Sequence, residues 1–423
     1  MPRLAWFGPL PPVKSGIAQY TRELLPALSS SHQIDLFVDG DPRRFASPDT
    51  RARVFDAHDF VWKNVREPYD LVVYQMGNAP CHDYMWAYLV RYPGLVVLHD
   101  GQLHHARARQ LLQQKRYDDY RGEFRFNHPD AKPDVAELGA DGLLGSLTYL
   151  WPMLRIVVQS SRLVVVHNRW LAGAIREVHA KASIEVVQMG VPDPEPRRGA
   201  AAAIRIRHHI PEDAVLFMAF GKVTPEKRVR EAIRALGAIS DAVPDAHLLL
   251  AGETVEYYDT LAAARTLGIE HKMTVAGFIA DDEIDDYLME ADVCLCMRWP
   301  SSRETSASWL RCIAAGRPTI TTDLVHTVDV PTLDPRSWSV VHASAGLEPG
   351  TTRTIEPVGV SIDIVDEDHS LKLAMRRLAT DARLRATLGK NARTLWNECF
   401  RLDQMASRYR AVIDMALALP LQD

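Results

Sequence analysis

The sequence has no apolar run of the roughly 18 residues that a membrane-spanning helix needs. Its first residues, MPRLAWFGPLPP, also lack the apolar core of a secretory signal peptide. We therefore expect a cytoplasmic protein, and contact with the inner face of a membrane stays open. Neither sign of charge dominates, because the formal net charge is only -5. This balance argues against a chain built mainly to bind nucleic acid.

Cysteine is scarce, with five residues in a chain of 423. Cys294 and Cys296 stand two apart in an apolar run and would share one strand face, and no second Cys/His pair follows at zinc-finger spacing. The sequence therefore predicts reduced thiols, no metal and no cofactor.

A chain of this length is too long for one typical core and predicts two α/β domains. Short apolar runs alternate with amphipathic stretches, beginning with a strand-like run at 4–7 and a helical pattern at 17–29. Further strand-like runs of the first half are 34–38, 71–74, 95–99, 163–167 and 184–189. This order predicts a parallel sheet that is covered on both faces.

A proline-rich stretch at 191–203 reads as a linker, and the alternation restarts after it. Strand-like runs of the second half are 215–220, 247–251, 273–276, 293–297 and 319–321, before a mostly helical region from 366. We predict a first domain over 1–192 joined by a C-terminal helix in 400–423, and a second domain over 193–399. Residues 117–141 are polar without a clear period, and we expect a long loop or irregular insertion there.

Ligands of open α/β sheets bind beyond the carboxyl ends of the strands, so the residues after each strand are the site candidates. The first strand leads through a Gly/Pro-rich loop to Gly16, at the start of a helix. Glycine lets the backbone approach a ligand, and a helix N-terminus attracts anions. His99 and Asp100 end the run at 95–99. An ordinary turn and a capped helix start are the alternatives for these two places.

Three cations follow the first strand of the second half: Lys222, Lys227 and Arg228. We expect Lys227 and Arg228 to begin a helix, where the helix dipole disfavours positive charge. A bound diphosphate would relieve that conflict through charge-assisted hydrogen bonds. A solvated basic turn is the alternative.

A polar turn after the strand at 293–297 opens a helix that runs to about residue 315. Its free N–H groups are candidates to hold phosphate or sugar oxygens, and Glu304 is a candidate acceptor for sugar hydroxyls. Arg311, two turns into this helix, would need an anionic partner if buried. The candidate donor-binding residues of the segment are Glu304, Thr305, Ser306, Ala307, Ser308 and Arg311.

With these motifs in this order, the whole chain resembles the GT-B retaining glycosyltransferases of the family 4 type. The resemblance implies two doubly wound Rossmann-like domains facing across a cleft, with a C-terminal helix that crosses back to the first. It implies that Lys222 and Lys227 bind the diphosphate of a nucleotide sugar, of the GDP-mannose or UDP-glucose type. It also implies that His99 lies beside the donor sugar and that Gly16 lets the backbone reach a donor phosphate.

The sequence departs from that family in its Glu-x7-Glu motif. Counting back from Gly316, the usual second glutamate falls on Arg311 and the usual first on Arg303, one place before Glu304. The segment resembles a branch that reads R-x-P-x-x-x-E-T-S-x-x-x-x-R. Arg311 cannot accept hydrogen bonds from ribose hydroxyls, because a guanidinium only donates.

The resemblance implies transfer of a hexose with retention, catalysed by His99, Lys222, Lys227 and Glu304, in bacterial glycan or glycoconjugate synthesis. The first domain would bind a glycan, a lipid-linked or a small-molecule acceptor, and the second the donor. Basic residues at 107–116 leave contact with a membrane surface open, with a solvated face as the alternative. A non-catalytic nucleotide-sugar-binding protein, and a sugar-nucleotide epimerase or phosphorylase of the same architecture, are the alternative functions.

Overall fold

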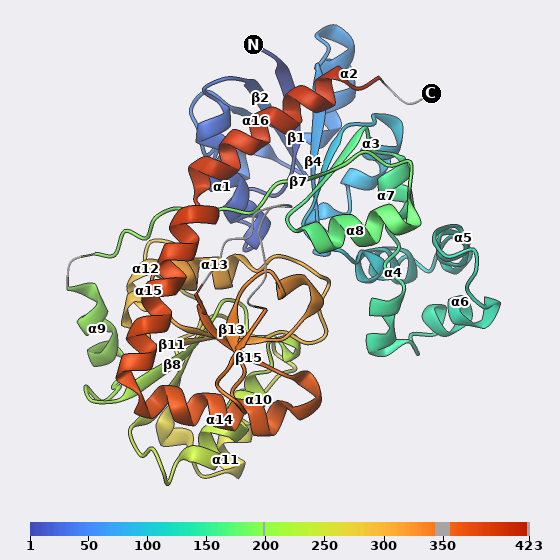
Figure 1. Ribbon diagram of the computed structural model, residues 1–423. Helices are drawn as coiled ribbons and strands as arrows, with labels where there is room; N and C mark the ends of the chain where they lie inside the picture. The colour runs from blue at the N-terminus through green and yellow to red at the C-terminus, as the bar shows by residue number, and fades with distance from the viewer. Residues whose placement is uncertain (198, 343–355, 421–423) are drawn as a thin grey trace. The chain divides into compact units, whose positions relative to one another are not determined.

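The computed structural model describes residues 1–197, 199–342 and 356–420, and the chain forms two compact units. Unit 1 comprises Met1–Met189, Pro300–Thr305 and Leu402–Asp423, and unit 2 comprises Gly190–Trp299 and Ser306–Arg401. Each unit has its own sheet with helices around it (Figure 1). The segment Pro300–Thr305 thus belongs to unit 1, although the chain on both sides of it belongs to unit 2.

The sheet of unit 1 is entirely parallel, in the order β3-β2-β1-β4-β5-β6-β7. Its strands are β1 (Arg3–Phe7), β2 (Gln33–Val38), β3 (Arg53–Asp56), β4 (Leu71–Met76), β5 (Leu95–Leu98), β6 (Leu163–Val166) and β7 (Ile184–Val186). The central strands β1, β4, β5 and β6 are buried along their whole length, as expected for a sheet with helices on both faces. The prediction of a parallel sheet is confirmed, while β3 was not anticipated.

Helices surround this sheet, and α1 follows the loop after β1. The α-helices are α1 (Gly16–Leu28), α2 (Phe60–Arg66), α3 (Met85–Arg91), α4 (His104–Gln113), α5 (Tyr117–Asn127), α6 (Pro133–Ala140), α7 (Arg155–Gln159), α8 (Arg169–Val178) and α16 (Leu402–Ala418). Short 3-10 helices are η1 (Pro42–Arg44), η2 (Ala57–Asp59), η3 (Pro80–His82) and η4 (Gly145–Leu150). The final helix α16 packs on α1, so the predicted return of the C-terminal helix to the first domain is confirmed.

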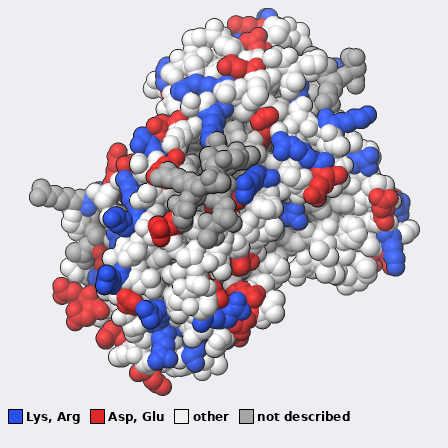
Figure 2. Space-filling model, viewed as in Figure 1, with Lys and Arg blue, Asp and Glu red and all other residues white. Residues whose placement is uncertain are grey.

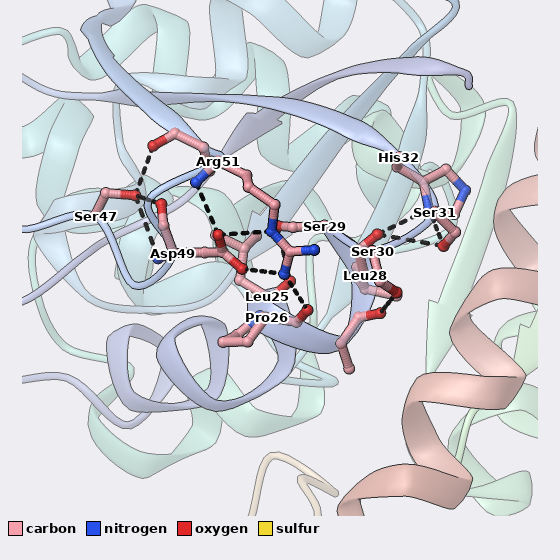
Figure 3. Close-up of polar contacts among 12 residues, drawn as sticks. Leu25, Pro26, Leu28, Ser29, Ser30, Ser31, His32, Ser47, Asp49 and Arg51 are labelled. Atoms are coloured by element: carbon pink, nitrogen blue, oxygen red, sulfur yellow. Dashed lines mark hydrogen bonds and ion pairs between the residues drawn. The ribbon is translucent and has the colours of Figure 1, made fainter.

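Hydrogen bonds fix both ends of α1. At its start the Ser15 hydroxyl accepts from the Ile17 amide at 3.2 Å, which satisfies one of the free N–H groups. At its end the Arg51 guanidinium donates to the Pro26 carbonyl at 3.1 Å and pairs with Asp49 (Figure 3). A cation at a helix C-terminus is favoured by the helix dipole. Side-chain hydrogen bonds therefore stabilise both ends of α1.

The prediction of a loop at 117–141 is wrong, because α5 and α6 occupy most of this stretch. Asp118 and Asp119 stand in the first turn of α5, where the dipole favours acids, and Pro133 opens α6 at a position that needs no N–H. Tyr120 and Phe124, one turn apart, face a small core. That core comprises Leu111, Tyr120, Phe124, Ala136, Ala140 and Met153. Helices this short bury too few residues to give a visible period.

The described residues of unit 2 form an eight-stranded sheet in the order β10-β9-β8-β11-β12-β15-β13-β14, in which the pair β13–β14 is antiparallel and the other pairs are parallel. Its strands are β8 (Val215–Phe220), β9 (Ala246–Ala251), β10 (Met273–Val275), β11 (Val293–Cys296), β12 (Thr319–Thr322), β13 (Thr332–Leu333), β14 (Val340–Val341) and β15 (Gly359–Ile362). The first five confirm predicted strands. The last three are short and were not anticipated.

The helices of unit 2 include the long pair that ends the second half of the chain. They are α9 (Ala200–Arg207), α10 (Val229–Ile239), α11 (Thr260–Thr266), α12 (Ile284–Glu290), α13 (Ala307–Ala314), α14 (Glu367–Thr380) and α15 (Ala382–Cys399). Its 3-10 helices are η5 (Pro225–Lys227), η6 (Glu270–Lys272), η7 (Val325–Thr327) and η8 (Ile364–Asp366). Within the described ranges of the chain, no helix is both long and apolar enough to cross a membrane.

Candidate functional site

His99 follows β5 directly, and its ring is almost fully buried, with 8% of its surface exposed. Its Nε2 lies 2.8 Å from Oε1 of Gln75, and its Nδ1 lies 3.4 Å from Nε2 of His167. Burial, reinforced by the neighbouring His167, holds the pKa of His99 well below its ordinary value. The ring is therefore neutral at physiological pH, and both of its nitrogens already have partners within unit 1.

Two buried tyrosines extend this polar cluster. Tyr20 on α1 donates to the Tyr409 hydroxyl on α16 at 3.0 Å, and its ring stands edge-on to His99 with centroids 4.8 Å apart. The Gln75 amide reaches the same hydroxyl of Tyr409 at 3.5 Å. Burial raises the pKa of both tyrosines. The cluster is thus uncharged and hydrogen-bonded, an arrangement that fixes side chains firmly. Sequence analysis missed Gln75, His167 and Tyr409 because they come from distant elements.

Asp100 holds the loop after β4. Its carboxylate accepts from the Asn78 amide at 2.9 Å, and the Asn78 side chain donates to Gln102. Gly101 then passes so close to the Ser302 carbonyl that a Cβ would stand 2.5 Å from that oxygen. Its amide donates to the same oxygen at 2.7 Å. A glycine is therefore required at 101, for close backbone approach within unit 1.

The segment Pro300–Thr305 is tied to the start of α8 by Asn168. The Asn168 side chain caps α8 by accepting from the Leu171 amide at 2.8 Å, and it donates to the Arg303 carbonyl at 2.9 Å. Its amide also lies 3.5 Å from the hydroxyl of Thr305. Glu304 accepts from the Ser301 hydroxyl at 3.0 Å. Glu304 and Thr305 thus lie in unit 1, together with His99 and Asp100.

Gly16 stands at the first position of α1, where a free helix N-terminus begins. A Cβ at this position would meet nothing within 4 Å. Unlike Gly101, this glycine is not required by the packing of the structure around it. The open space is compatible with close approach of a ligand, as the sequence predicts.

Lys227 is the central cation of the candidate site in unit 2. Its Nζ donates to the Phe220 carbonyl at 2.6 Å. Both this Nζ and the Ser308 hydroxyl lie within 3.1 Å of the point where a Cβ on Gly221 would stand, and Gly221 has a positive φ of 87°. The turn thus brings the ammonium group beside the first turn of α13. Burial, and then the nearby Arg298 guanidinium, lowers the pKa of Lys227 to about 8.

Arg228 does not begin a helix together with Lys227, contrary to the expectation from the sequence. Lys227 ends η5, and Arg228 has a left-handed φ of 57° before α10 begins at Val229. Its guanidinium is held by Glu367 at 2.9 Å and by Glu231 at 3.1 Å. Lys222 lies in the preceding turn with its side chain exposed. These carboxylates neutralise Arg228, which leaves Lys222 and Lys227 as the better anion ligands.

The start of α13 presents polar groups to the same region of unit 2. Ser306 caps the helix, since its hydroxyl accepts from the Trp309 amide at 3.2 Å. Ala307 and Ser308 form the first turn, and Arg311 is half-buried farther along. A helix N-terminus beside an ammonium group favours a bound anion. Among the described residues, no group of three or more His, Cys, Asp or Glu side chains is placed to hold a metal ion.

Comparison with known proteins shows sequence similarity to glycosyltransferases. Residues 212–334 match a protein-family model described as glycosyl transferases group 1. The 2-deoxystreptamine glucosyltransferase of Streptomyces kanamyceticus is 29% identical over 144 residues, 33% of this chain and 36% of that protein. The match therefore spans about a third of the relative's length.

Solved structures match over nearly the whole chain. Sucrose-phosphate synthase from Thermosynechococcus elongatus has a TM-score of 0.68 at 15% identity, with 99% of this chain and 100% of that chain covered. Anabaena HepE in complex with UDP has a TM-score of 0.64 at 14% identity, with 98% and 100% covered. The chain has the GT-B fold. The predicted fold of two Rossmann-like domains is confirmed, and the prediction of a glycosyltransferase agrees with the three comparisons.

Proposed function

We propose that the GT-B chain is a retaining, metal-independent glycosyltransferase that moves a hexose from a nucleotide diphosphate sugar to a hydroxyl acceptor. The observation that carries this proposal is the half-buried Lys227 ammonium group at the start of α13. Among the described residues it forms no ion pair, while a second cation, Arg298, lies close enough to lower its pKa. A dianionic diphosphate would neutralise the Lys227 charge and accept from N–H groups at the start of α13.

The charge of the departing diphosphate grows as the bond from the anomeric carbon to the phosphate oxygen breaks. Lys227, Lys222 and the N–H groups of α13 would stabilise that charge more strongly than they stabilise the intact donor. Such a difference lowers the barrier. The departing phosphate oxygen would take the proton of the acceptor hydroxyl, on the same face of the sugar. No protein nucleophile is needed, and the configuration is retained.

The residues of unit 1 receive narrower roles than the sequence alone implies. Both nitrogens of His99 are hydrogen-bonded to Gln75 and His167, so we assign His99 to holding the strand end rather than to proton transfer. Glu304 remains the candidate acceptor for sugar hydroxyls, and Asp100 remains a candidate donor-binding residue. We no longer include Arg228 among the proposed donor-binding residues, because Glu367 and Glu231 neutralise its charge.

UDP-glucose is the first donor to test, ahead of GDP-mannose. Anabaena HepE has been solved with UDP and with UDP-glucose, and the relative from Streptomyces kanamyceticus is a glucosyltransferase. A donor that binds the folded chain raises its melting temperature by mass action. A thermal-shift series over UDP- and GDP-sugars would identify the nucleotide.

We place the enzyme in the cytoplasm, in bacterial glycan or glycoconjugate synthesis.

Lys227→Ala tests this function directly. We expect turnover of the donor, measured as release of nucleoside diphosphate, to fall about 100-fold, as when other transition-state stabilising groups are removed. Lys272→Ala is the matched control, since the Lys272 Nζ also donates to a backbone carbonyl, that of Pro244 at 2.5 Å. Turnover within twofold of wild type in Lys227→Ala would refute the role of Lys227.

The alternative functions give different products. Donor binding without turnover by wild-type protein would identify a nucleotide-sugar-binding protein. Products that require inorganic phosphate would identify a phosphorylase, and an epimerised donor would identify an epimerase. Product analysis by mass spectrometry and NMR, with and without phosphate, separates these outcomes.

A further inference from the structure

A pocket in unit 1 lies outside the candidate site, between α4, α6 and the segment that leads into η4. Its volume is about 270 Å³. Ala108, Leu112 and Leu144 provide much of its apolar lining, and Tyr120 contributes from α5. None of the proposed donor-binding residues lines it.

A chain of hydrogen bonds joins this pocket to the strand end at Asp100. Asp100 accepts from Asn78, and Asn78 donates to Gln102. The Gln102 side chain then lies 3.1 Å from Nδ1 of His105, and Nε2 of His105 lies 2.9 Å from the Thr148 hydroxyl. His105 and Thr148 both line the pocket. Its polar groups are therefore continuous with the candidate site.

Arg109, the cation of the lining, does not favour a charged ligand. Arg109 is paired with Asp83 at 2.8 Å and also donates to the Asn78 carbonyl. No carboxylate stands among the described residues that line the pocket. A cationic ligand would thus meet no counter-charge, whereas a neutral alcohol can donate a hydrogen bond to the Thr148 hydroxyl, because a hydroxyl oxygen has two acceptor lone pairs.

An apolar ridge extends from the pocket over η4. In a 3-10 helix, side chains three residues apart lie above one another, so Leu144, Leu147 and Leu150 form one row. Leu144 is buried against the pocket, while Leu147 and Leu150 are 56% and 69% exposed. Leu143, 68% exposed, lies beside them. The surface over α4 and α6, at the lower right of Figure 2, carries few charged side chains. Exposed apolar groups gathered in one place are typical of a binding surface.

We propose that this pocket and ridge bind the apolar chain of the acceptor, which is a neutral lipid-type alcohol. The pocket takes the first part of the chain, and Leu147 and Leu150 cover the part that extends beyond it. The proposal rests on the function proposed above. In the transfer, the acceptor oxygen bonds to the anomeric carbon, the bond from that carbon to the phosphate oxygen breaks, and the hydroxyl proton moves to the departing phosphate.

Binding of two alkyl glycosides measures the apolar part of this recognition. The probes are n-octyl β-D-glucopyranoside, below its micelle concentration, and methyl β-D-glucopyranoside, with affinity followed by ligand-observed NMR. We expect the octyl glycoside to bind at least tenfold tighter, which corresponds to burial of about two methylenes. Equal affinity for the two probes would overturn the proposal.

Three variants locate the binding. Ala108→Phe fills the pocket and should weaken octyl glycoside binding about tenfold. The double variant Leu147→Ser/Leu150→Ser should weaken it about fivefold, and it leaves the core intact because both leucines are exposed. Val178→Ser, at a 72% exposed position at the end of α8, removes a similar apolar surface elsewhere in unit 1 and should have no effect. If Ala108→Phe lowers the melting temperature, the double variant decides.

Two further measurements separate the competing explanations. Binding to phosphatidylcholine vesicles tests whether the ridge is a membrane contact instead: loss of vesicle binding in the double variant, with octyl glycoside binding unchanged, would overturn the acceptor proposal. UDP binding and donor hydrolysis should stay within twofold of wild type in all three variants. A failure of the donor function would appear in the Lys227→Ala experiment, independently of these probes.

Discussion

The two units differ in the charge of the polar side chains at their strand ends. In unit 1, His99, Gln75 and Tyr409 form a buried cluster without charge. In unit 2, Lys227 keeps an ammonium group half-buried beside a helix N-terminus, near a second cation. A neutral cluster fixes geometry, while a cation without a counter-ion creates affinity for an anion. Under the proposed function, unit 2 would therefore bind the charge of the donor, while the polar cluster of unit 1 would fix the shape of its strand ends.

The largest expected difference between the two units is their response to acid. As the pH falls, unit 1 should unfold first. Burial lowers the pKa of His82, His104 and His167 to about 4, below the ordinary value of about 6.5. Between these values the unfolded chain binds more protons, so stability is lost as the pH falls from about 6.5 towards 4. Each of these rings should cost about 2 kcal/mol at pH 4.5. In unit 2, His247 shows a comparable shift and His208 a smaller one.

Hydrogen exchange at pH 7 and pH 4.5, corrected for the intrinsic rate, measures this difference between the units. Peptides from β4 and β5 should lose more protection than peptides from β8 and β9. The variant His167→Gln should reduce the loss in unit 1, because it removes one of the buried titrating rings. Equal loss of protection in both units would contradict the contrast.

Within unit 2, we expect Arg228 to have a structural role, in contrast to Lys227, which is proposed to bind the ligand. Arg228→Ala leaves Glu367, which is 7% exposed, without its main partner, and should lower the free energy of unfolding by about 3 kcal/mol. The Kd for UDP should stay within twofold, since the guanidinium is already neutralised. Urea denaturation and calorimetric titration measure the two effects.

The double variant Arg228→Met/Glu367→Leu is the control for Arg228, because it removes both charges and keeps apolar volume at the two positions. Its stability should recover towards wild type, as when a buried ion pair is replaced as a whole. A large loss of UDP affinity in Arg228→Ala, with unchanged stability, would indicate that Arg228 binds the donor after all.

The next largest expected effect is the pH dependence of UDP binding, which follows from the lowered pKa of Lys227. Since this pKa is lowered to about 8, the ammonium charge is lost as the pH rises through 8, and diphosphate binding should weaken by up to tenfold per pH unit above it. The Kd for UDP between pH 7 and pH 9.5, at constant ionic strength, measures this. Lys227→Arg should remove the pH dependence, because its guanidinium stays charged. A flat profile for wild type would show that Lys227 does not meet the phosphates.

The sequence predicts some parts of this molecule well and others poorly, for physical reasons. The central strands are buried on both faces, so they appear as continuous apolar runs, and the strand ends identify Lys227 and Asp100 as candidates. The helices within 117–141 bury only a few residues each, and the strand β13 has two residues, so neither gives a period. The bond between Tyr20 and Tyr409 joins residues 389 apart in sequence, and no local pattern encodes it. For the same reason, the hydrogen-bond partners of His99 and the carboxylates that neutralise Arg228 appear only in the structure.

The smallest expected effect concerns Gly16, and it tests whether unit 1 also meets the donor. A Cβ on Gly16 meets nothing within 4 Å, so Gly16→Ala should leave stability unchanged or raise it by up to about 1 kcal/mol. Gly221→Ala is the contrasting variant, since its positive φ strains any other residue. If the backbone at Gly16 touches a donor phosphate, Gly16→Ala will lower transfer without lowering the melting temperature. If transfer is unchanged, the glycine only opens α1, and charge recognition belongs to unit 2 alone.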